Sequence, residues 1–239
     1  GTEGNGRADD SAADDGGVVL DAQAGSVFVT SDGTGAGAGS DVSAAAGDVT
    51  LIATQDLKAG VVTSGGNVDI SGQTGVELAG LTTTDNASTA SVEAAMGRVV
   101  IDDFSLRTAT NTFTGESQTA GDPSVVLGGG VLDGVAGPTE EIVLLEVNGG
   151  AEGTSLSGDI TSNGPSGLTV NGDLRVPAGA DVAIDVAEST DPVNAAGDVT
   201  LGDVILGADP GVSDTAMLAV TSEDGVITLG DVTVANEAG

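Results

Sequence analysis

The stretch GDVTLIATQDLKAGVVTSGGNVDI, residues 47–70, contains one short phrase twice. Each copy is a glycine, an acid or amide, and then two apolar residues separated by one residue, which are Val49 with Leu51 and Val68 with Ile70. This period of two places the apolar side chains on one face of a strand. Because such a short strand is not stable alone, the phrase predicts strands that pack on further copies of themselves.

The phrase recurs along the chain, as GSVFV (25–29), GRVVI (97–101), GDLRV (172–176), GDVTL (197–201) and GVITL (225–229). Shorter echoes lie between these copies, such as GDVIL (202–206) and GDVTV (230–234), so each unit holds two or three strands. Units of about 20 residues bury their apolar faces by stacking, with strands about 4.8 Å apart. We therefore expect a β-solenoid. The leading glycine is expected to adopt positive φ at the corner between two strands. The side chain of the acid or amide is expected to form hydrogen bonds with the backbone of the turn.

A β-sandwich is the alternative, because it also has short alternating strands. Sandwiches usually pack around aromatic residues, whereas this chain has three Phe and no Trp or Tyr. This composition favours the solenoid. The Ala-containing stretch 87–96 is the best candidate for a helix, although its Ser and Thr content favours a loop or short strand equally.

The expected organisation is a flexible acidic end or linker at residues 1–16, followed by one solenoid over residues 17–239. Polar stretches predict loop insertions near 31–46, 82–95 and 108–123, on the outside of the stack where they could bind a ligand. The run GVITLGDVTV continues the repeat to Val234 without a visible cap. Since uncapped strand edges attract further strands, we expect head-to-tail stacking into a homopolymer or continuation within a longer chain.

The charge balance excludes several functions. The chain has 5 basic and 37 acidic residues, a net charge of −32, and neither Cys nor His. Disulfides, zinc ribbons, thiol nucleophiles and imidazole bases are therefore absent. Nucleic acid and the anionic inner leaflet are disfavoured, and no apolar run is long enough for a membrane span. The acidic surface, in which Lys58 is the only lysine, fits a saline or calcium-containing extracellular environment and resembles a halophilic balance.

The phrases GDVTL, GNVDI, GDLRV and GDVTLGDVIL resemble the repeats of filamentous haemagglutinin-like large exoproteins and autotransporter adhesins, over residues 17–106 and 167–234. This resemblance implies a right-handed parallel β-helix, secreted to the cell surface as a shaft or adhesive fibre that binds host or matrix glycans. Shafts of that family are usually longer, so the chain would be a fragment, a processed subunit or a small relative.

Calcium is the only cofactor that the residues suggest, and none is required. Carboxylates at strand starts and turns supply the hard oxygen ligands that Ca²⁺ takes. The candidates are Asp48, Asp69, Asp102, Asp103, Asp173, Asp198, Asp203 and Asp231. The alternative is that these aspartates cap turns on a solvated face, since neither an EF-hand loop nor the calcium-binding nonapeptide repeat is present. Like charges about 4.8 Å apart on stacked coils would still make bound or diffuse cations stabilising.

A polysaccharide-degrading β-helix enzyme is a further alternative, with paired carboxylates and with Lys58, Arg98, Arg107 and Arg175 as the available bases. Because the aromatic residues that stack on sugars are scarce and Arg98 is expected to form a local salt bridge with Asp102 or Asp103, we expect no catalytic residues. The triplet Asn86-Ala87-Ser88 is a candidate N-glycosylation site.

Overall fold

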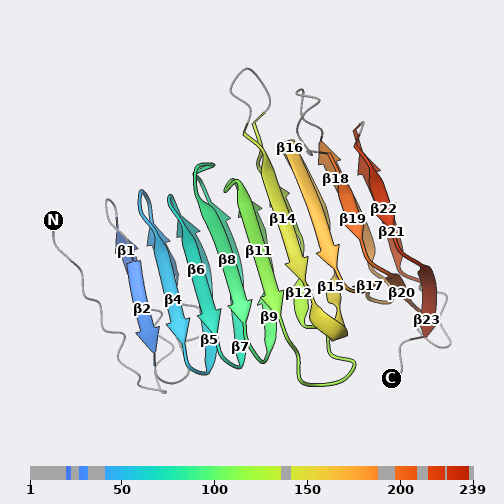
Figure 1. Cartoon of the computed structure of the whole chain (residues 1–239), viewed down its shortest axis with the longest axis horizontal. Helices are drawn as coiled ribbons and strands as arrows, with labels where there is room; N and C mark the ends of the chain where they lie inside the picture. The colour runs from blue at the N-terminus through green and yellow to red at the C-terminus, as the bar shows by residue number, and fades with distance from the viewer. Residues whose placement is uncertain are drawn as a thin grey trace.

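The computed structural model describes residues 20–22, 27–31, 41–135, 141–187, 197–208, 215–223 and 225–236. Within these ranges the chain is a parallel β-solenoid, and the strands follow one another along its long axis from the blue to the red end (Figure 1). One short 3-10 turn, η1 (Gly150–Glu152), interrupts the strands. The predicted all-β parallel β-helix is confirmed. The predicted flexible end at residues 1–16 lies outside the described residues.

Each coil of the solenoid contributes a strand to three parallel ladders. The first ladder consists of β2 (Val27–Ser31), β4 (Val49–Ala53), β6 (Val68–Gly72), β8 (Thr89–Ala94), β11 (Thr110–Gly115), β14 (Val143–Asn148), the second half of β16 (Ile160–Asn171), β19 (Val199–Leu201) and β22 (Ile227–Leu229).

The second ladder consists of the first halves of β5 (Asp56–Ser64) and β7 (Gly75–Thr83), then β9 (Arg98–Ile101), β12 (Val125–Leu127), β15 (Thr154–Leu156), β17 (Leu174–Val176), β20 (Val204–Ala208) and β23 (Val232–Asn236). The third ladder consists of β1 (Leu20–Ala22), β3 (Val42–Ala44), the second halves of β5 and β7, β10 (Phe104–Leu106), β13 (Gly130–Leu132), the first half of β16, β18 (Asp181–Ala187) and β21 (Met217–Ser222).

The core is a column of small branched side chains, because every inward position of a ladder repeats in the next coil. One inward row of the first ladder contains Leu51, Ile70, Val92, Phe113, Val147, Val170 and Leu201, all of them buried. Phe113 meets Phe104 of the third ladder edge to face, with ring centroids 5.9 Å apart. The alternation of apolar and polar residues therefore sets which face of each strand is buried.

The glycines that lead the phrases serve close packing more than backbone curvature. Gly172 and Gly197 adopt positive φ, as predicted. Gly97 and Gly225 do not, so the prediction is wrong there. A Cβ atom on Gly97 would lie 1.6 Å from the carbonyl oxygen of Thr74, and one on Gly225 would lie 2.2 Å from the carbonyl oxygen of Gly197. Coils approach too closely at these corners to admit a side chain.

The predicted insertions are smaller than expected, because strands of the ladders occupy parts of them. Strand β3 lies within 31–46, β8 within 82–95 and β11 within 108–123. In β8, the alternation buries Ala90, Val92 and Ala94 and exposes Thr89, Ser91 and Glu93. The stretch 87–96 therefore contains a strand rather than a helix. The polar residues of this stretch occupy the outward positions of a strand. Composition alone cannot distinguish such a strand from a loop.

Candidate functional site: corners and open end of the stack

Acidic and amide side chains at the corners link successive coils. In each case an Asp or Asn just before a strand accepts a hydrogen bond from the backbone N–H at the same corner position one coil later, at 2.7–3.1 Å. The acceptor and donor pairs are Asp41 with Val61, Asp48 with Asn67, Asn67 with Thr89, Asp159 with Ala183, Asp198 with Val226, and Asp203 with Asp231. We call these contacts corner bonds.

The corner bonds give a structural role to three of the candidate calcium ligands, Asp48, Asp198 and Asp203. The sequence predicts hydrogen bonds from such residues to their own turn. In the structure these three aspartates accept a backbone N–H of the following coil. Each one therefore stabilises the stacking of coils.

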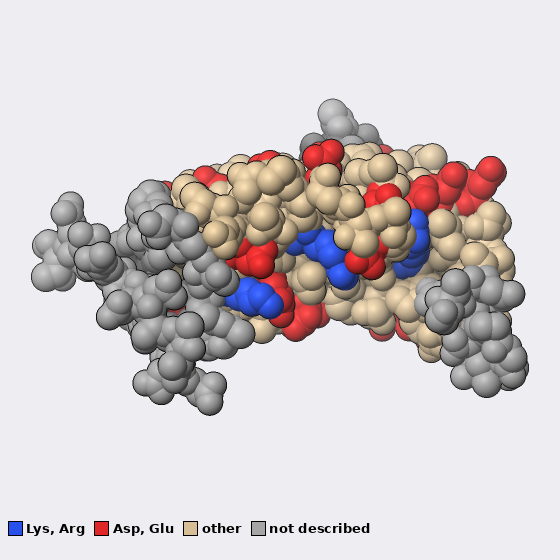
Figure 2. All heavy atoms as spheres, turned by 90° about the horizontal axis from the view of Figure 1, so that it is seen from below, with Lys and Arg blue, Asp and Glu red and all other residues tan. Residues whose placement is uncertain are grey.

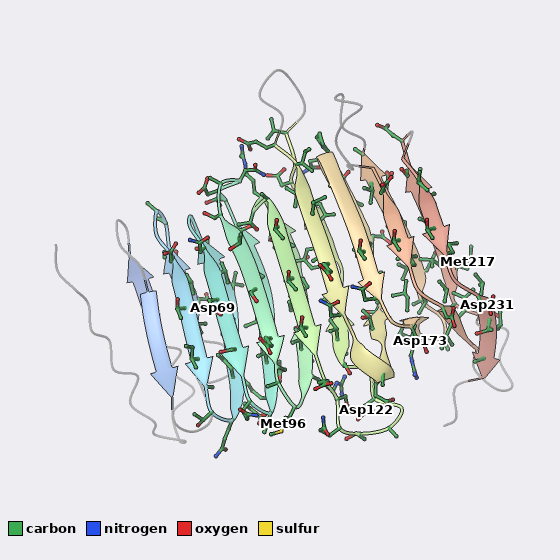
Figure 3. All side chains as sticks on the ribbon, viewed as in Figure 1. Asp69, Met96, Asp122, Asp173, Met217 and Asp231 are labelled. Atoms are coloured by element: carbon green, nitrogen blue, oxygen red, sulfur yellow. The ribbon has the colours of Figure 1, made fainter. Side chains whose placement is uncertain are left out.

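The eight candidate ligands lie in five separate places. Asp69 is exposed on the outer face of the first ladder, and Asp102 with Asp103 lies at the corner between β9 and β10. Asp48 and Asp198 occupy equivalent corners far apart along the stack, before β4 and β19. Figure 3 shows Asp173 and Asp231 near one end of the molecule and Asp69 in the other half. Within the described ranges, no group of three metal-ligating side chains converges.

Asp173, Asp203 and Asp231 are the candidates that the fold brings into one column. They precede Leu174, Val204 and Val232, which pair in consecutive coils of the second ladder. The carbonyl oxygens of Asp203 and Asp231 accept the N–H groups of Leu174 and Val204 at 2.8 and 2.7 Å. Each neighbouring pair of carboxylates about 4.8 Å apart repels by roughly 1 kcal/mol in water before screening, so cations should stabilise this column.

Three basic residues lie on the second ladder or its corner: Lys58 in β5, Arg98 in β9 and Arg175 in β17. Figure 2 shows basic side chains in a band across the face seen from below, with acidic side chains around them. Lys58 Nζ lies 2.6 Å from Glu77 Oε2, and the hydrogen bond and the charge of Glu77 raise the pKa of Lys58. This exposed pair contributes little stability.

Arg98 differs from the prediction. The sequence predicts a local salt bridge with Asp102 or Asp103, but Arg98 begins β9 and these acids follow its other end. Among the described residues Arg98 forms no ion pair, so that prediction is wrong. Each residue of an extended strand advances the chain by about 3.3 Å, so the strand separates Arg98 from the two acids at its other end.

Arg107 and Asn86 connect the turns that follow the third ladder in successive coils, Arg107 to the next coil and Asn86 to the next two. Arg107 Nη2 and Nε donate to Glu141 Oε2 at 2.7 and 2.9 Å, and this contact raises the pKa of Arg107. Asn86 Nδ2 donates to the carbonyl oxygens of Arg107 and Ile142 at 3.0 and 3.1 Å. A glycan on Asn86 would replace one of the two Nδ2 hydrogens that make these bonds, so glycosylation of the folded chain would compete with this contact.

A buried polar cluster inside the stack was missed by sequence reasoning. Thr83 Oγ1 accepts the N–H groups of Arg107 and Thr108 at 2.9 and 3.1 Å. Asn111 Nδ2 donates to the carbonyl oxygens of Thr108 and Leu144 at 2.8 and 3.0 Å. The residue that signals this cluster in the sequence is Asn111, a polar residue at an inward position of its strand. In the ladder it lies between Ala90 and Leu145.

The last described coil leaves apolar residues exposed that are buried elsewhere in the stack. Ile227, Leu229 and Val232 are 41%, 42% and 57% exposed, whereas their partners one coil earlier are 0–2% exposed. Those partners are Val199, Leu201 and Val204. A hollow of about 340 Å³ opens there, lined by Val204, Leu206, Leu218, Val220, Ile227, Leu229 and Val232. We call this surface the open end.

The strands at the open end also have unpaired backbone edges. In the part of the chain that the structure describes, β21 pairs only with β18, β22 only with β19 and β23 only with β20. Every internal coil presents the same type of surface to its successor. The chemistry of the open end is therefore that of a template for a further parallel coil.

No helix in the described ranges has the length and hydrophobicity required to cross a bilayer. Comparison of the chain with family models, with curated protein sequences and with solved structures gives no match.

Proposed function

We propose that the chain is a structural or adhesive module of the extracellular or cell surface, acting as a solenoid shaft. The observation that carries this proposal is the stack itself, in which the three ladders run from β1 to β23. A solenoid whose coils contact only their neighbours extends in one dimension, and it presents long outer faces. Corner bonds at 2.7–3.1 Å connect coils along the stack and make the rod stiffer.

The surface chemistry supports an extracellular, saline setting. A net charge of −32 keeps such a rod soluble when cations screen the repulsion between carboxylates. The resemblance of the phrases to exoprotein repeats supports host or matrix glycans as ligands of the outer faces. Polar side chains project from the outer face of the first ladder, including Thr50, Asp69, Ser91, Thr112 and Glu146.

A calcium-dependent binding module is the second candidate, and the column of Asp173, Asp203 and Asp231 is the observation that favours it. Its signature would be a large loss of thermal stability in chelator that sodium does not restore. The polysaccharide-degrading alternative would be revealed by release of reducing ends from acidic polysaccharides.

The test of the proposed function combines location and binding. Antibodies against the chain should label the surface of the cells that produce it in immunogold electron microscopy. Beads coated with the chain should bind matrix or glycan surfaces, and beads coated with heat-denatured chain provide the control. Labelling confined to the cell interior, together with no binding above that control, would overturn the proposal.

A further inference from the structure

We propose that the open end is the docking site for a second copy of this chain, whose first coil stacks on it in the register of the internal ladders. This inference rests on the proposed function and deepens it, because it names the partner and the geometry of assembly. It concerns β21, β22 and β23 of one copy and β1 and β2 of the next.

The open end leaves apolar side chains that a further coil would bury. Ile227, Leu229, Val232 and Val234 are all more than two-fifths exposed. Removal of apolar side chains from water is the dominant favourable contribution to most protein association. A coil that covers the open end would fill the 340 Å³ hollow and bury these side chains, as each internal coil does for its predecessor. Burial of these side chains therefore favours association with a further coil.

The parallel direction of the strands makes the two ends of the ladders complementary. At the opposite end of the stack, β1 pairs only with β3 and β2 only with β4 among the described residues. In a parallel ladder the free edge at one end complements the free edge at the other, because one coil-to-coil translation relates all strands. Two copies related by that translation continue the ladders. The contact is heterologous and does not close, so it generates a fibre.

The ladders also give the register of the contact. Leu20 begins the row that runs through Val42 to Val220, and Val27 begins the row that runs to Ile227. In the next copy, Leu20 therefore stacks on Val220 and Val27 on Ile227. By the same register, Asp21 of the incoming copy lies opposite Thr221.

Charge makes this assembly dependent on salt. The column formed by Asp173, Asp203 and Asp231 reaches the open end, and each copy has a net charge of −32. At about 1 M salt the screening length falls to about 3 Å, which removes most of the repulsion between copies. Assembly should therefore appear at high salt and reverse on dilution of the salt.

The test uses disulfide cross-linking, for which the chain is suited because it contains no cysteine. The double variant Asp21→Cys/Thr221→Cys places two thiols on strands about 4.8 Å apart across the proposed contact, within the range of a disulfide. Oxidation at about 1 M salt should give a ladder of covalent multimers on a denaturing gel.

Two control variants accompany the cross-linking experiment, one positive and one negative. Asp185→Cys/Thr221→Cys joins residues that pair within one chain, so it should form an intramolecular disulfide and show that oxidation works. Ser43→Cys/Thr221→Cys places the first thiol one coil deeper, about 10 Å from Thr221 of the neighbour, too far for a disulfide. It should give no multimers.

A second measurement does not depend on cysteine chemistry. Ile227→Lys places a charge in the hollow of the open end and should abolish the high-salt fibres, with sedimentation of the monomer unchanged. Thr228→Lys, on the outer face of the same strand, should assemble like the unmodified chain.

The outcomes separate this inference from the proposed function. Monomers at high salt, or multimers from the Ser43→Cys control equal to those from the Asp21→Cys variant, overturn the inference and leave the surface-labelling test untouched. Fibres from a chain that labels the cell interior would overturn the proposed function and support the inference.

Discussion

The carboxylate of Asp203 accepts a hydrogen bond from the backbone N–H of Asp231, one coil later at the same corner, at 2.9 Å. Asp41, Asp48, Asp159 and Asp198 make the equivalent contact at other corners. Part of the acidic excess therefore has a structural purpose, because these carboxylates bond backbone donors where the chain leaves one ladder and enters the next.

Removal of a corner bond should destabilise the stack. Asp159 Oδ1 accepts the N–H of Ala183 at 2.7 Å, so Asp159→Ala should lower the free energy of unfolding by about 1 kcal/mol. Asp159→Asn keeps an acceptor oxygen, as Asn67 does in its own corner bond, and should retain most of the stability. Urea denaturation checks both variants. Equal stability of the Ala variant and the unmodified chain would contradict a stabilising corner bond.

The aspartate column should make stability depend on ionic strength. Asp203→Asn keeps the acceptor oxygen for Asp231 but removes the central charge of the column, so it should raise stability at low salt by about 1 kcal/mol for each repulsive pair removed. Thermal denaturation over a sodium chloride series measures this effect. Asp69→Asn is the matched control, because its ladder neighbours are Thr50 and Ser91.

Sodium and calcium distinguish screening from a specific site. If screening dominates, sodium chloride restores any stability that a chelator removes, and we expect this result. A loss that only calcium restores, and that Asp203→Asn abolishes, would instead support the calcium-dependent module.

Close packing at the glycine corners should tolerate no side chain. In Gly97→Ala the new Cβ would lie 1.6 Å from the backbone oxygen of Thr74, so the two coils must separate and the variant should lose several kcal/mol of stability. In Gly80→Ala the nearest atom is Val61 Cγ2 at 3.4 Å, an ordinary contact, and the variant should stay folded. Circular dichroism melting compares the pair. A Gly97→Ala variant as stable as Gly80→Ala would refute the packing explanation.

The buried polar cluster should be sensitive to loss of its acceptor. Thr83→Val keeps the shape but leaves the N–H groups of Arg107 and Thr108 without the Thr83 oxygen, at a cost of about 1–3 kcal/mol for each buried donor. Thr83→Ser keeps the hydroxyl and should lose much less stability. Chemical denaturation with hydrogen exchange at Arg107 and Thr108 tests this prediction, and unchanged protection of both amides in the Val variant would contradict it.

Local pattern predicted the strands well where inward and outward positions differ strongly in polarity. It identified the phrases whose apolar residues begin at Val49, Val68 and Val199, and the structure has β4, β6 and β19 there. It failed for β8, whose inward residues are Ala90, Val92 and Ala94, because small side chains give a weak hydrophobic signal. The pattern also could not predict that Arg107 pairs with Glu141 or that Asn86 contacts Ile142, since these contacts depend on which coils are neighbours.

The sequence by itself determined the class of fold, because a period of two, repeated after glycine with few aromatic residues, can bury its apolar face only by stacking. The tertiary structure alone decided the register, since which residue lies above which depends on the length of every intervening turn. From the register follow the corner bonds, the column of Asp173, Asp203 and Asp231, and the open end beside Ile227 and Val232. These features involve residues one coil apart, whose contacts form only when the whole chain is wound.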